Sequence, residues 1–310
     1  MTYNIPNTIY VIKKQPKSGF SYDEDNLKQE YKFLNKYIDK EEEHNKSFCE
    51  HNKDYNRYKD IRPFTYNTIE INKGKEGNHY INASGINAYQ KNFFIATQGP
   101  KEKTIKDFWT MIDEQGCKMI VMLCQLKENN KSKCENYWNT DYSYVKKVKE
   151  GEEEEEKEGE HVNNIIPQWT FRDIHYKLPN SNEDKKVRQM HFTEWKDKDV
   201  PDIGNGEIFN NFIDSFDCID RQSKGKISDD RCSPVVVHCS AGVGRTGTYI
   251  AMYYLYKEIM EQKDGNIITF SIFNLVRKLK EMRAYLVQTD QQYLFLYKFA
   301  EHLLKKINFI

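Results

Sequence analysis

Residues Val235 to Gly247 read V-V-V-H-C-S-A-G-V-G-R-T-G, and the rest of this 310-residue chain is arranged around them. The three apolar, β-branched valines are typical of a buried central strand. His238 and Cys239 end this strand, and the two glycines that follow allow the chain to turn tightly. At Thr246 the sequence changes to a helical pattern. The stretch therefore predicts a strand, a tight loop and a helix, with a thiol at the helix N-terminus.

The position of this loop has chemical consequences. A helix N-terminus and a group of inward-pointing backbone N–H groups both favour negative charge, so we expect Cys239 to ionise more readily than a free thiol. The same N–H groups suit a tetrahedral oxyanion. The planar guanidinium of Arg245 can bind two phosphate oxygens at once. A nucleophile beside a loop that binds phosphate predicts phosphoryl transfer to sulfur.

The composition of the chain excludes several classes of partner. Lysine plus arginine and aspartate plus glutamate number 47 each, so no basic field would draw the protein to nucleic acid or anionic lipid. The N-terminus lacks a signal-peptide pattern, and no apolar run approaches the ~18 residues of a membrane span. The seven cysteines lack zinc-finger spacing, which indicates reduced thiols. We expect a soluble, cytoplasmic protein, and a monomer.

The remaining segments predict one α/β domain over residues 25–310, with a central mixed, twisted β-sheet flanked by α-helices. Segments that predict strands lie at 68–71, 80–83, 93–98, 119–123, 169–177 and 186–193. Segments with helical spacing lie at 27–51, 107–115, 209–216, 246–260, 272–282 and 290–305. Residues 1–24 predict a loose arm or an added cap. The acidic run within 145–160 predicts a solvated insert, either a loop or a hairpin extension.

The stretch from His238 to Gly247 resembles the active-site signature of the cysteine-dependent protein tyrosine phosphatases. A bare C-x5-R motif is weak evidence, but the preceding valines and the S-A-G-V-G loop extend the match.

Further motifs of this family follow in the family's order between about residues 31 and 304. N-R-Y-x-D at 56–60 resembles the phosphotyrosine-recognition loop, and Y-I-N-A-S at 80–84 and T-Q-G-P at 97–100 resemble structural motifs. K-C-x2-Y-W at 133–138 resembles the stretch after the glutamate loop. W-K-D at 195–197 stands where the mobile Trp-Pro-Asp acid loop belongs, and Q-T-x2-Q-Y at 288–293 resembles the glutamine loop.

The resemblance implies a two-step hydrolysis of phosphotyrosine in proteins or peptides, without a metal or another cofactor. Cys239 would attack phosphorus, and Arg245 with the loop N–H groups would bind the phosphate oxygens. Asp197 would act first as general acid and then as general base, and Gln288 would position the attacking water. Thr246 would hydrogen-bond the departing thiolate. The loop residues implied in phosphate binding are Ser240, Ala241, Gly242, Val243 and Gly244.

The resemblance also implies residues that select the substrate and support the site. Tyr58 would lie against the substrate ring and make the pocket too deep for phosphoserine, and Asp60 would accept backbone N–H groups of the peptide. Glu128 would orient Arg245, and Lys133 would bind the closed acid loop. The other residues implied in support are His238, which would help to keep Cys239 ionised, and Trp195 and Gln292.

Lys196 is the main departure from the family pattern, because proline stands there in relatives. Proline fixes φ, so lysine predicts slower closure of the acid loop and reduced turnover. Asp199 is a rival for the role of acid. Lys196 also favours an alternative function, a phosphotyrosine-binding module without turnover. A phosphoinositide or dual-specificity phosphatase is disfavoured, because those relatives lack the N-R-Y loop.

Several of these residues have simpler interpretations. Tyr58 is one of 21 tyrosines and suits a packing role on composition alone. Glu128 and Lys133 suit a solvated pair in a polar loop. Gln288 suits a cap of the last helix. Cys232 is most simply a spectator, and the alternative is a reversible disulfide with an oxidised nucleophile.

Overall fold

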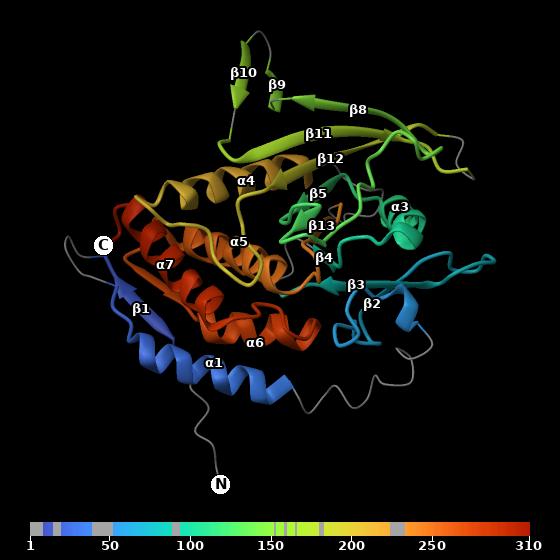
Figure 1. The fold of residues 1–310 in the computed structure, drawn as a ribbon. Coiled ribbons are helices and arrows are strands. Elements are labelled where there is room, and N and C mark those ends of the chain that lie inside the picture. Colours follow the sequence, from blue (N-terminus) through green and yellow to red (C-terminus); the bar gives the residue numbers. More distant parts are fainter. Residues whose placement is uncertain are drawn as a thin grey trace.

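The computed structural model describes residues 9–14, 20–38, 52–88, 94–151, 153–157, 160–164, 166–179, 183–223 and 233–310. Within these residues the main structure is an eight-stranded mixed sheet (Figure 1). Its strands, in spatial order, are β2 (Thr68–Glu70), β3 (Tyr80–Ile86), β4 (Phe94–Thr97), β13 (Val235–His238), β5 (Met119–Met122), β12 (Lys185–Phe192), β11 (Trp169–Tyr176) and β8 (Val145–Gly151). The predicted α/β fold with a central mixed sheet is confirmed.

The valine run forms β13, in the middle of this sheet. β13 pairs in parallel with both β4 and β5, so that Val236 lies opposite Ile95 and Ile120. β12 also pairs in parallel with β5, whereas the strands toward both edges pair antiparallel. All four residues of β13 are buried, as expected for a strand whose two faces are both covered.

Helices cover both faces of the sheet. In Figure 1, α3 (Ile105–Glu114) lies on one side of the inner strands, and α4 (Glu207–Ser223) and α5 (Gly244–Gln262) lie on the other. α6 (Ile272–Met282) and α7 (Asp290–Lys306) pack against α5, and α1 (Glu24–Ile38) packs against both of them. Of the helices described, none combines the length and the apolar character needed to cross a membrane.

The helix that follows the Cys239 loop is buried on all sides. Every residue of α5 from Gly244 to Tyr256 is buried. A helix without a polar face needs partners all round, and β13, α4, α6 and α7 supply them. Its first turn is fixed where the N–H of Gly247 donates to the carbonyl of Val243 at 2.8 Å. The loop before this helix is therefore held between two buried elements.

Part of the predicted N-terminal arm is docked on the domain. β1 (Tyr10–Lys13) pairs antiparallel with β14 (Ile267–Phe270) in a separate two-stranded sheet. Phe20 is buried, and its ring lies 4.9 Å from that of Tyr10 and 5.7 Å from that of Phe270. These apolar contacts explain why the segment adheres to the surface. The rest of the arm, residues 1–8 and 15–19, lies outside the described residues.

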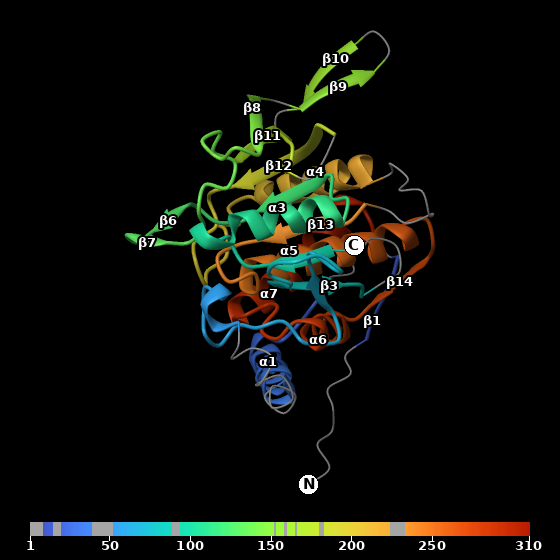
Figure 2. The same ribbon diagram turned by 90° about the vertical axis from the view of Figure 1, so that its right-hand side faces the viewer.

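The predicted acidic insert at 145–160 contains strands. β8 extends the central sheet beside β11, with Val148 opposite Ile174 and Val145 buried. β9 (Glu153–Lys157) and β10 (Glu160–Asn164) form a separate antiparallel hairpin, which projects from the body of the molecule in both ribbon views (Figures 1 and 2). Of the two predicted alternatives, the structure contains the hairpin extension, because strand pairing satisfies backbone groups that a polar segment cannot bury.

Candidate active site

The loops that leave the four parallel strands meet at one edge of the sheet. Because β4, β13, β5 and β12 run in the same direction, their carboxyl ends lie together, which is where open α/β sheets bind ligands. β13 leads into the loop Cys239–Arg245, here called the phosphate loop. β5 leads into the hairpin of β6 (Lys127–Glu128) and β7 (Lys131–Ser132), and β12 leads into the acid loop, Trp195–Asp199.

One pocket at this edge unites most of the predicted site residues. Those that line it are Tyr58, Asp60, Lys133, Asp197, Cys239, Ser240, Ala241, Gly244, Arg245, Gln288 and Gln292. Glu128, Trp195, His238, Gly242, Val243 and Thr246 are absent from this lining and contact or adjoin the residues that form it. The fold therefore brings eleven of the predicted residues into one pocket, although they come from segments far apart in the chain.

The shape of the phosphate loop depends on Gly242. Its φ is +72°, and a Cβ atom there would lie 2.1 Å from the carbonyl oxygen of Thr97. A larger residue would therefore clash with the backbone at the end of β4. Gly247, just after the loop, is similarly confined, since a Cβ atom would lie 2.4 Å from the backbone nitrogen of Val287. The two glycines let the loop approach both neighbouring backbones.

The thiol of Cys239 is buried in a setting that favours its anion. Burial alone raises a thiol pKa, but the charge of Arg245 and hydrogen bonds from Thr246 and the N–H of Val243 outweigh it, so that the pKa of Cys239 is lowered. The Thr246 hydroxyl is itself buried and has no partner within ordinary hydrogen-bond geometry among the described residues, so it is available to the nearby sulfur. Cys232, the alternative disulfide partner, lies outside those residues.

Arg245 is held rigidly beside this thiol. Its side chain is 1% exposed, and its Nη1 donates to Glu128 Oε1 at 2.7 Å and to the Trp195 carbonyl at 2.6 Å. Burial disfavours the charge of the guanidinium, but Cys239 and Glu128 stabilise it and raise the pKa of Arg245. A fixed, charged guanidinium next to the sulfur is suited to bind an anion that the sulfur attacks.

The β6–β7 hairpin presents Glu128 and Lys133 to the pocket. Asn129 and Asn130 form its turn with φ values of 49° and 60°, the left-handed conformations that a type I′ turn requires and asparagine tolerates. Glu128 binds Arg245, and Lys133 Nζ donates to Asp197 at 2.5 Å. The simpler interpretation of Glu128 and Lys133 as a solvated pair does not describe these contacts.

The acid loop places the carboxylate of Asp197 in the pocket lining. Asp197 Oδ1 is 3.5 Å from Arg245 Nη2, on the side of the carboxylate that Lys133 does not occupy. Partial burial opposes ionisation, but Lys133 and Arg245 lower the pKa of Asp197. The Trp195 indole N–H donates to the backbone carbonyl of Asp199 at 2.7 Å and closes the loop on itself.

Asp199, the rival for the role of acid, is directed elsewhere. Its carboxylate accepts the backbone N–H of Val200 at 2.9 Å, and the residue is absent from the pocket lining. Asp197 lines the pocket and faces Arg245. Between the two carboxylates, the geometry favours Asp197.

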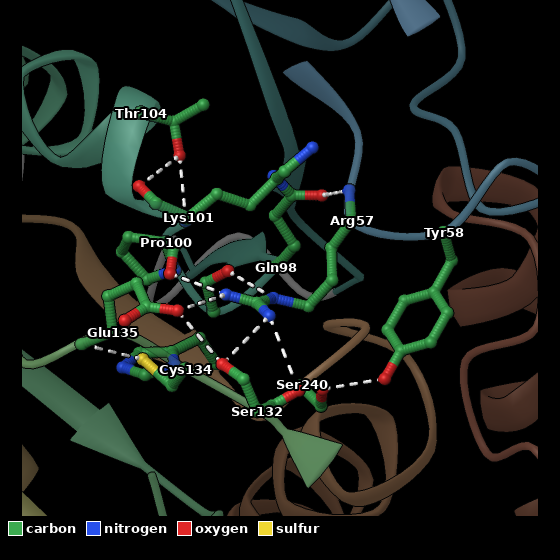
Figure 3. A network of polar contacts seen from close by, with 12 residues as sticks. Arg57, Tyr58, Gln98, Pro100, Lys101, Thr104, Ser132, Cys134, Glu135 and Ser240 are labelled. Carbon is green, nitrogen blue, oxygen red and sulfur yellow. Dashed lines mark hydrogen bonds and ion pairs between the residues drawn. The ribbon is translucent and has the colours of Figure 1, made fainter. Parts of the chain in front are cut away.

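Tyr58, in the loop of residues 56–60, contacts the phosphate loop through a hydrogen bond (Figure 3). Its hydroxyl lies 2.8 Å from the Ser240 hydroxyl, although the residue is 36% exposed. Arg57 fixes this approach, because its Nη2 donates to the Pro100 carbonyl at 2.6 Å and its Nε to the Gly99 carbonyl at 3.0 Å. Tyr58 therefore lines the pocket with a partly exposed ring, whereas a residue used only for packing would be buried.

Gln288 lies beside the phosphate loop. A Cβ atom on Gly244 would be 3.1 Å from Gln288 Oε1, and the backbone N–H of Gln288 donates to Gln292 Oε1 at 2.9 Å. The cap of α7 is Thr289, whose hydroxyl accepts the N–H of Gln292 at 3.1 Å. The side chain of Gln288 is therefore not needed as a helix cap.

His238 is fully buried directly before the thiol. Burial lowers the pKa of His238 to about 3, so the ring is neutral at physiological pH. Its Nδ1 lies 3.1 Å from the carbonyl oxygen of Cys239. Any support that His238 gives to the thiolate therefore acts through the backbone rather than through a charge.

Arg283 is a site residue that the sequence analysis missed. It is completely buried beneath the phosphate loop, and it donates to the carbonyls of Gly242 at 2.9 Å and Ala241 at 3.2 Å. The same side chain binds Asn82 Oδ1 at 2.6 Å. These bonds hold two carbonyl groups of the phosphate loop from its buried side. The only signal in the sequence is an arginine just before the apolar segment that leads to Gln288.

Comparison with known proteins agrees with this geometry. A family model described as protein-tyrosine phosphatase matches residues 52–302. The chain is 35% identical over 251 residues to receptor-type tyrosine-protein phosphatase eta of Mus musculus, and 36% identical over 268 residues to tyrosine-protein phosphatase 99A of Drosophila melanogaster. These matches cover 79% and 80% of this chain, but 18% and 19% of those proteins. The chain thus spans about a fifth of the length of these curated relatives.

Solved structures of PTPN18 are similar to this chain. One of them comes from work on the structural basis of the PTPN18 fingerprint on distinct HER2 tyrosine phosphorylation sites. It matches with a TM-score of 0.72 and 26% sequence identity. The match covers 90% of this chain and 95% of that chain. Another, of PTPN18 in complex with HER2 phosphopeptides, matches with a TM-score of 0.71 and 26% identity, over 90% of this chain and 99% of that one.

Proposed function

Because the chain belongs to the protein-tyrosine phosphatase family, we propose that it hydrolyses phosphotyrosine in proteins and peptides through a cysteinyl-phosphate intermediate. We assign the activity to a catalytic domain of residues 25–310. The observation that carries the proposal is that Cys239, Arg245 and Asp197 line one pocket, with the thiol pKa lowered. These are the groups that nucleophilic attack on a phosphate monoester requires.

In the first step the Cys239 thiolate forms a bond to phosphorus, and the bond from phosphorus to the phenolic oxygen breaks. Arg245 and the N–H groups of the phosphate loop stabilise the equatorial oxygens as negative charge develops on them. Asp197 transfers its proton to the leaving phenolic oxygen. The products of this step are tyrosine and the cysteinyl phosphate.

The proton on Asp197 needs an explanation, because its pKa is lowered in the unliganded site. Lys133 and Arg245 both stabilise the carboxylate there. A bound phosphate dianion would pair with Arg245 in place of Asp197, and it would bring negative charge close to that carboxylate. Both changes raise the pKa of Asp197. Substrate binding itself would therefore convert Asp197 into an acid.

In the second step water attacks phosphorus and the sulfur–phosphorus bond breaks. Gln288, which lies beside the phosphate loop, would hold this water, and Asp197, now a carboxylate, would accept its proton. The Thr246 hydroxyl would stabilise the departing thiolate. Inorganic phosphate and free enzyme result.

The mouth of the pocket supports selection of phosphotyrosine. Tyr58 lies at its edge and Cys239 at its buried end, so a short phosphoserine side chain would not reach the sulfur. Asp60 is exposed on the same lining and would accept backbone N–H groups of a peptide. The binding of phosphopeptides by PTPN18, a structural relative, supports a peptide ligand at this position.

The test compares wild type, Cys239→Ser and Asp197→Ala on phosphotyrosine and phosphoserine peptides of one sequence. Wild type should hydrolyse only the phosphotyrosine peptide, and Cys239→Ser should hydrolyse neither. Asp197→Ala should lose about 100-fold or more in kcat while it still binds the peptide. Asp199→Ala is the matched control and should stay active, since its carboxylate faces away from the pocket.

A different result is expected if the protein is a phosphotyrosine-binding module. Wild type would then bind phosphotyrosine without turnover, because Lys196 would prevent closure of the acid loop. The position of the acid loop, with Asp197 3.5 Å from Arg245, favours the enzyme. Peptide binding without hydrolysis by wild type would reject the enzyme and select the module.

A further inference from the structure

Four hydrogen bonds connect strand β11 to the backbone of Cys239. Arg172 Nη1 is 2.9 Å from Gln189 Oε1, and Gln189 Nε2 is 2.6 Å from the Tyr137 hydroxyl. That hydroxyl is 2.9 Å from His238 Nε2, and His238 Nδ1 is 3.1 Å from the Cys239 carbonyl oxygen. The three central side chains are fully buried, so water does not compete for these bonds.

The two ends of the series together fix the direction of every bond. A guanidinium only donates, so the atom of Gln189 that faces Arg172 is the amide oxygen, and its NH₂ group faces Tyr137. At the other end the carbonyl of Cys239 only accepts, so the proton of the neutral His238 ring lies on Nδ1 and Nε2 is an acceptor. The hydroxyl of Tyr137 therefore accepts from Gln189 and donates to His238 Nε2.

Neither titratable member of the series can change its charge near neutral pH. Burial lowers the pKa of His238 to about 3, and the nearby His191, Arg57 and Arg245 also disfavour a second proton. Burial raises the pKa of Tyr137 well above its usual range, so its hydroxyl stays protonated. The direction set by the arginine is therefore maintained across the working pH range.

Arg172 is well placed to set this direction. Its Nη2 donates to Glu150 Oε1 at 2.9 Å, and its guanidinium lies 4.9 Å from the centre of the Trp138 ring. Nη1 is also 3.2 Å from His191 Nδ1, which must accept, so that His191 Nε2 donates to the Cys124 carbonyl at 2.8 Å. The same arginine thus also determines the tautomer of His191.

We propose that Arg172, Gln189 and Tyr137 are positioning residues that fix His238 as its neutral Nδ1–H tautomer and so hold the backbone of Cys239. The Nδ1–H group offsets the negative end of the Cys239 carbonyl, which would otherwise disfavour a thiolate on the same residue. All four bonds also point their positive ends toward the phosphate loop. The inference rests on the proposed role of Cys239 as nucleophile.

The sharpest test is Gln189→Glu, which preserves the shape of the side chain. A carboxylate accepts and cannot donate, so it would take the Tyr137 proton and leave His238 Nε2 without a donor. The ring would then carry its proton on Nε2, and the lone pair of Nδ1 would face the Cys239 carbonyl. We expect the pKa of Cys239 to rise by about one unit, which moves the pH profile of alkylation by iodoacetate upward by the same amount.

Nitrogen-15 NMR of the His238 ring reads the tautomer directly. We expect Nδ1–H in wild type and Nε2–H in Gln189→Glu. Gln29→Glu, at an exposed position on α1, adds the same charge and should change neither the tautomer nor the alkylation rate. An Nε2–H ring in wild type overturns the proposal without any variant, and so does an unchanged alkylation profile in folded Gln189→Glu protein.

A second variant covers the case in which Gln189→Glu does not fold. Tyr137→Phe removes the donor to His238 Nε2 and keeps the aromatic ring, and it should slow alkylation in the same direction. Both readouts are independent of turnover. A wild type with Nδ1–H but without phosphotyrosine hydrolysis rejects only the proposed function, whereas hydrolysis with Nε2–H rejects only the positioning network.

Discussion

At the level of single residues, Thr246 and Thr248 are chemically alike but differ in what their hydroxyl groups contact. The Thr248 hydroxyl donates to the Gly244 carbonyl at 2.9 Å, within α5, whereas the Thr246 hydroxyl lowers the pKa of Cys239. Thr246→Val should raise that pKa and so reduce the thiolate fraction at low pH. The midpoint of the alkylation pH profile should move upward by about one unit, the value of one hydrogen bond to a charged group.

Thr248→Val is the matched control, since it removes a buried hydroxyl at the same depth in the same helix. It should leave alkylation unchanged. Equal slowing in both variants would show that loss of packing in α5, rather than the bond to sulfur, controls the thiol.

Lys133 gives a prediction for the pH profile of turnover. Its ammonium lowers the pKa of Asp197, and the acid form of Asp197 is the one needed in the first step. Lys133→Met should therefore raise that pKa, keep Asp197 protonated to higher pH, and move the basic limb of the kcat profile upward. The measurement is kcat against pH on an aryl phosphate with a poor leaving group.

Lys127→Met is the control for this profile, because Lys127 lies on the same hairpin outside the pocket lining and its side chain is exposed. Its profile should coincide with that of wild type. A basic limb that stays in place in Lys133→Met would mean that Lys133 does not act on the ionisation of Asp197 in the complex.

At the level of elements, the acid loop contains a β-turn with an unfavourable residue. The N–H of Asp199 lies 3.3 Å from the carbonyl of Lys196, and Lys198, the third residue of this turn, has a φ of 59°. A left-handed conformation costs a residue with a Cβ atom roughly 1 kcal/mol. Together with the absence of proline at 196, this strain lowers the stability of the closed loop.

Lys196→Pro should raise turnover. The side chain of Lys196 is exposed, and its backbone N–H donates no hydrogen bond within the described part of the chain, so proline would lose no contact. Proline at a compatible position contributes about 0.4–1 kcal/mol, which corresponds to at most about a fivefold increase in kcat if loop closure limits the rate. An unchanged kcat in a stable Lys196→Pro protein would discard the idea that lysine slows closure.

Lys198→Gly tests the other half of the same turn. Glycine adopts the left-handed conformation without strain, so this variant should also favour the closed loop. Quenching of Trp195 fluorescence on addition of vanadate would report closure in both variants. Lys198→Ala retains the strain while removing the charge, and it separates the two contributions of this residue.

At the level of the whole molecule, the sequence predicts the features that depend on local pattern and misses those that depend on tertiary contacts. The valines of β13 and the spacing of α5, α6 and α7 are local properties, and these elements lie where they were predicted. Many of the motif residues also lie in one pocket, because the phosphate loop, the β6–β7 hairpin and the acid loop each follow a parallel strand of the sheet. The pairing of β1 with β14 was not predictable, since it joins segments about 250 residues apart that share no pattern.

The same reasoning explains which site residues were missed. Arg283 binds Ala241 across 42 positions, and Gln189 binds Tyr137 across 52 positions. A buried arginine and a buried glutamine look like surface residues in a sequence, because only their tertiary partners make their burial favourable. Their roles therefore become visible only in the folded chain.

The contact between α1 and the glutamine loop extends the site beyond the family match, which begins at residue 52. The Tyr31 hydroxyl donates to the Val287 carbonyl at 3.0 Å, one residue before Gln288. On the same helix Glu30 accepts from the hydroxyls of Tyr293 and Tyr297, at 2.9 and 3.2 Å. Helix α1 is thus tied both to α7 and to the predicted water-positioning loop.

Tyr31→Phe should slow hydrolysis of the cysteinyl phosphate more than its formation, because the lost bond positions the backbone next to Gln288. Glu30→Gln is the control on the same helix, since it weakens the tie to α7 without touching Val287. Each variant should lower the free energy of unfolding by about 1 kcal/mol in urea titrations. Rapid-quench measurements should then find a larger steady-state fraction of cysteinyl phosphate in Tyr31→Phe alone. If the intermediate accumulates equally in Glu30→Gln, docking of α1 as a whole controls the loop, and the Tyr31 bond has no separate role.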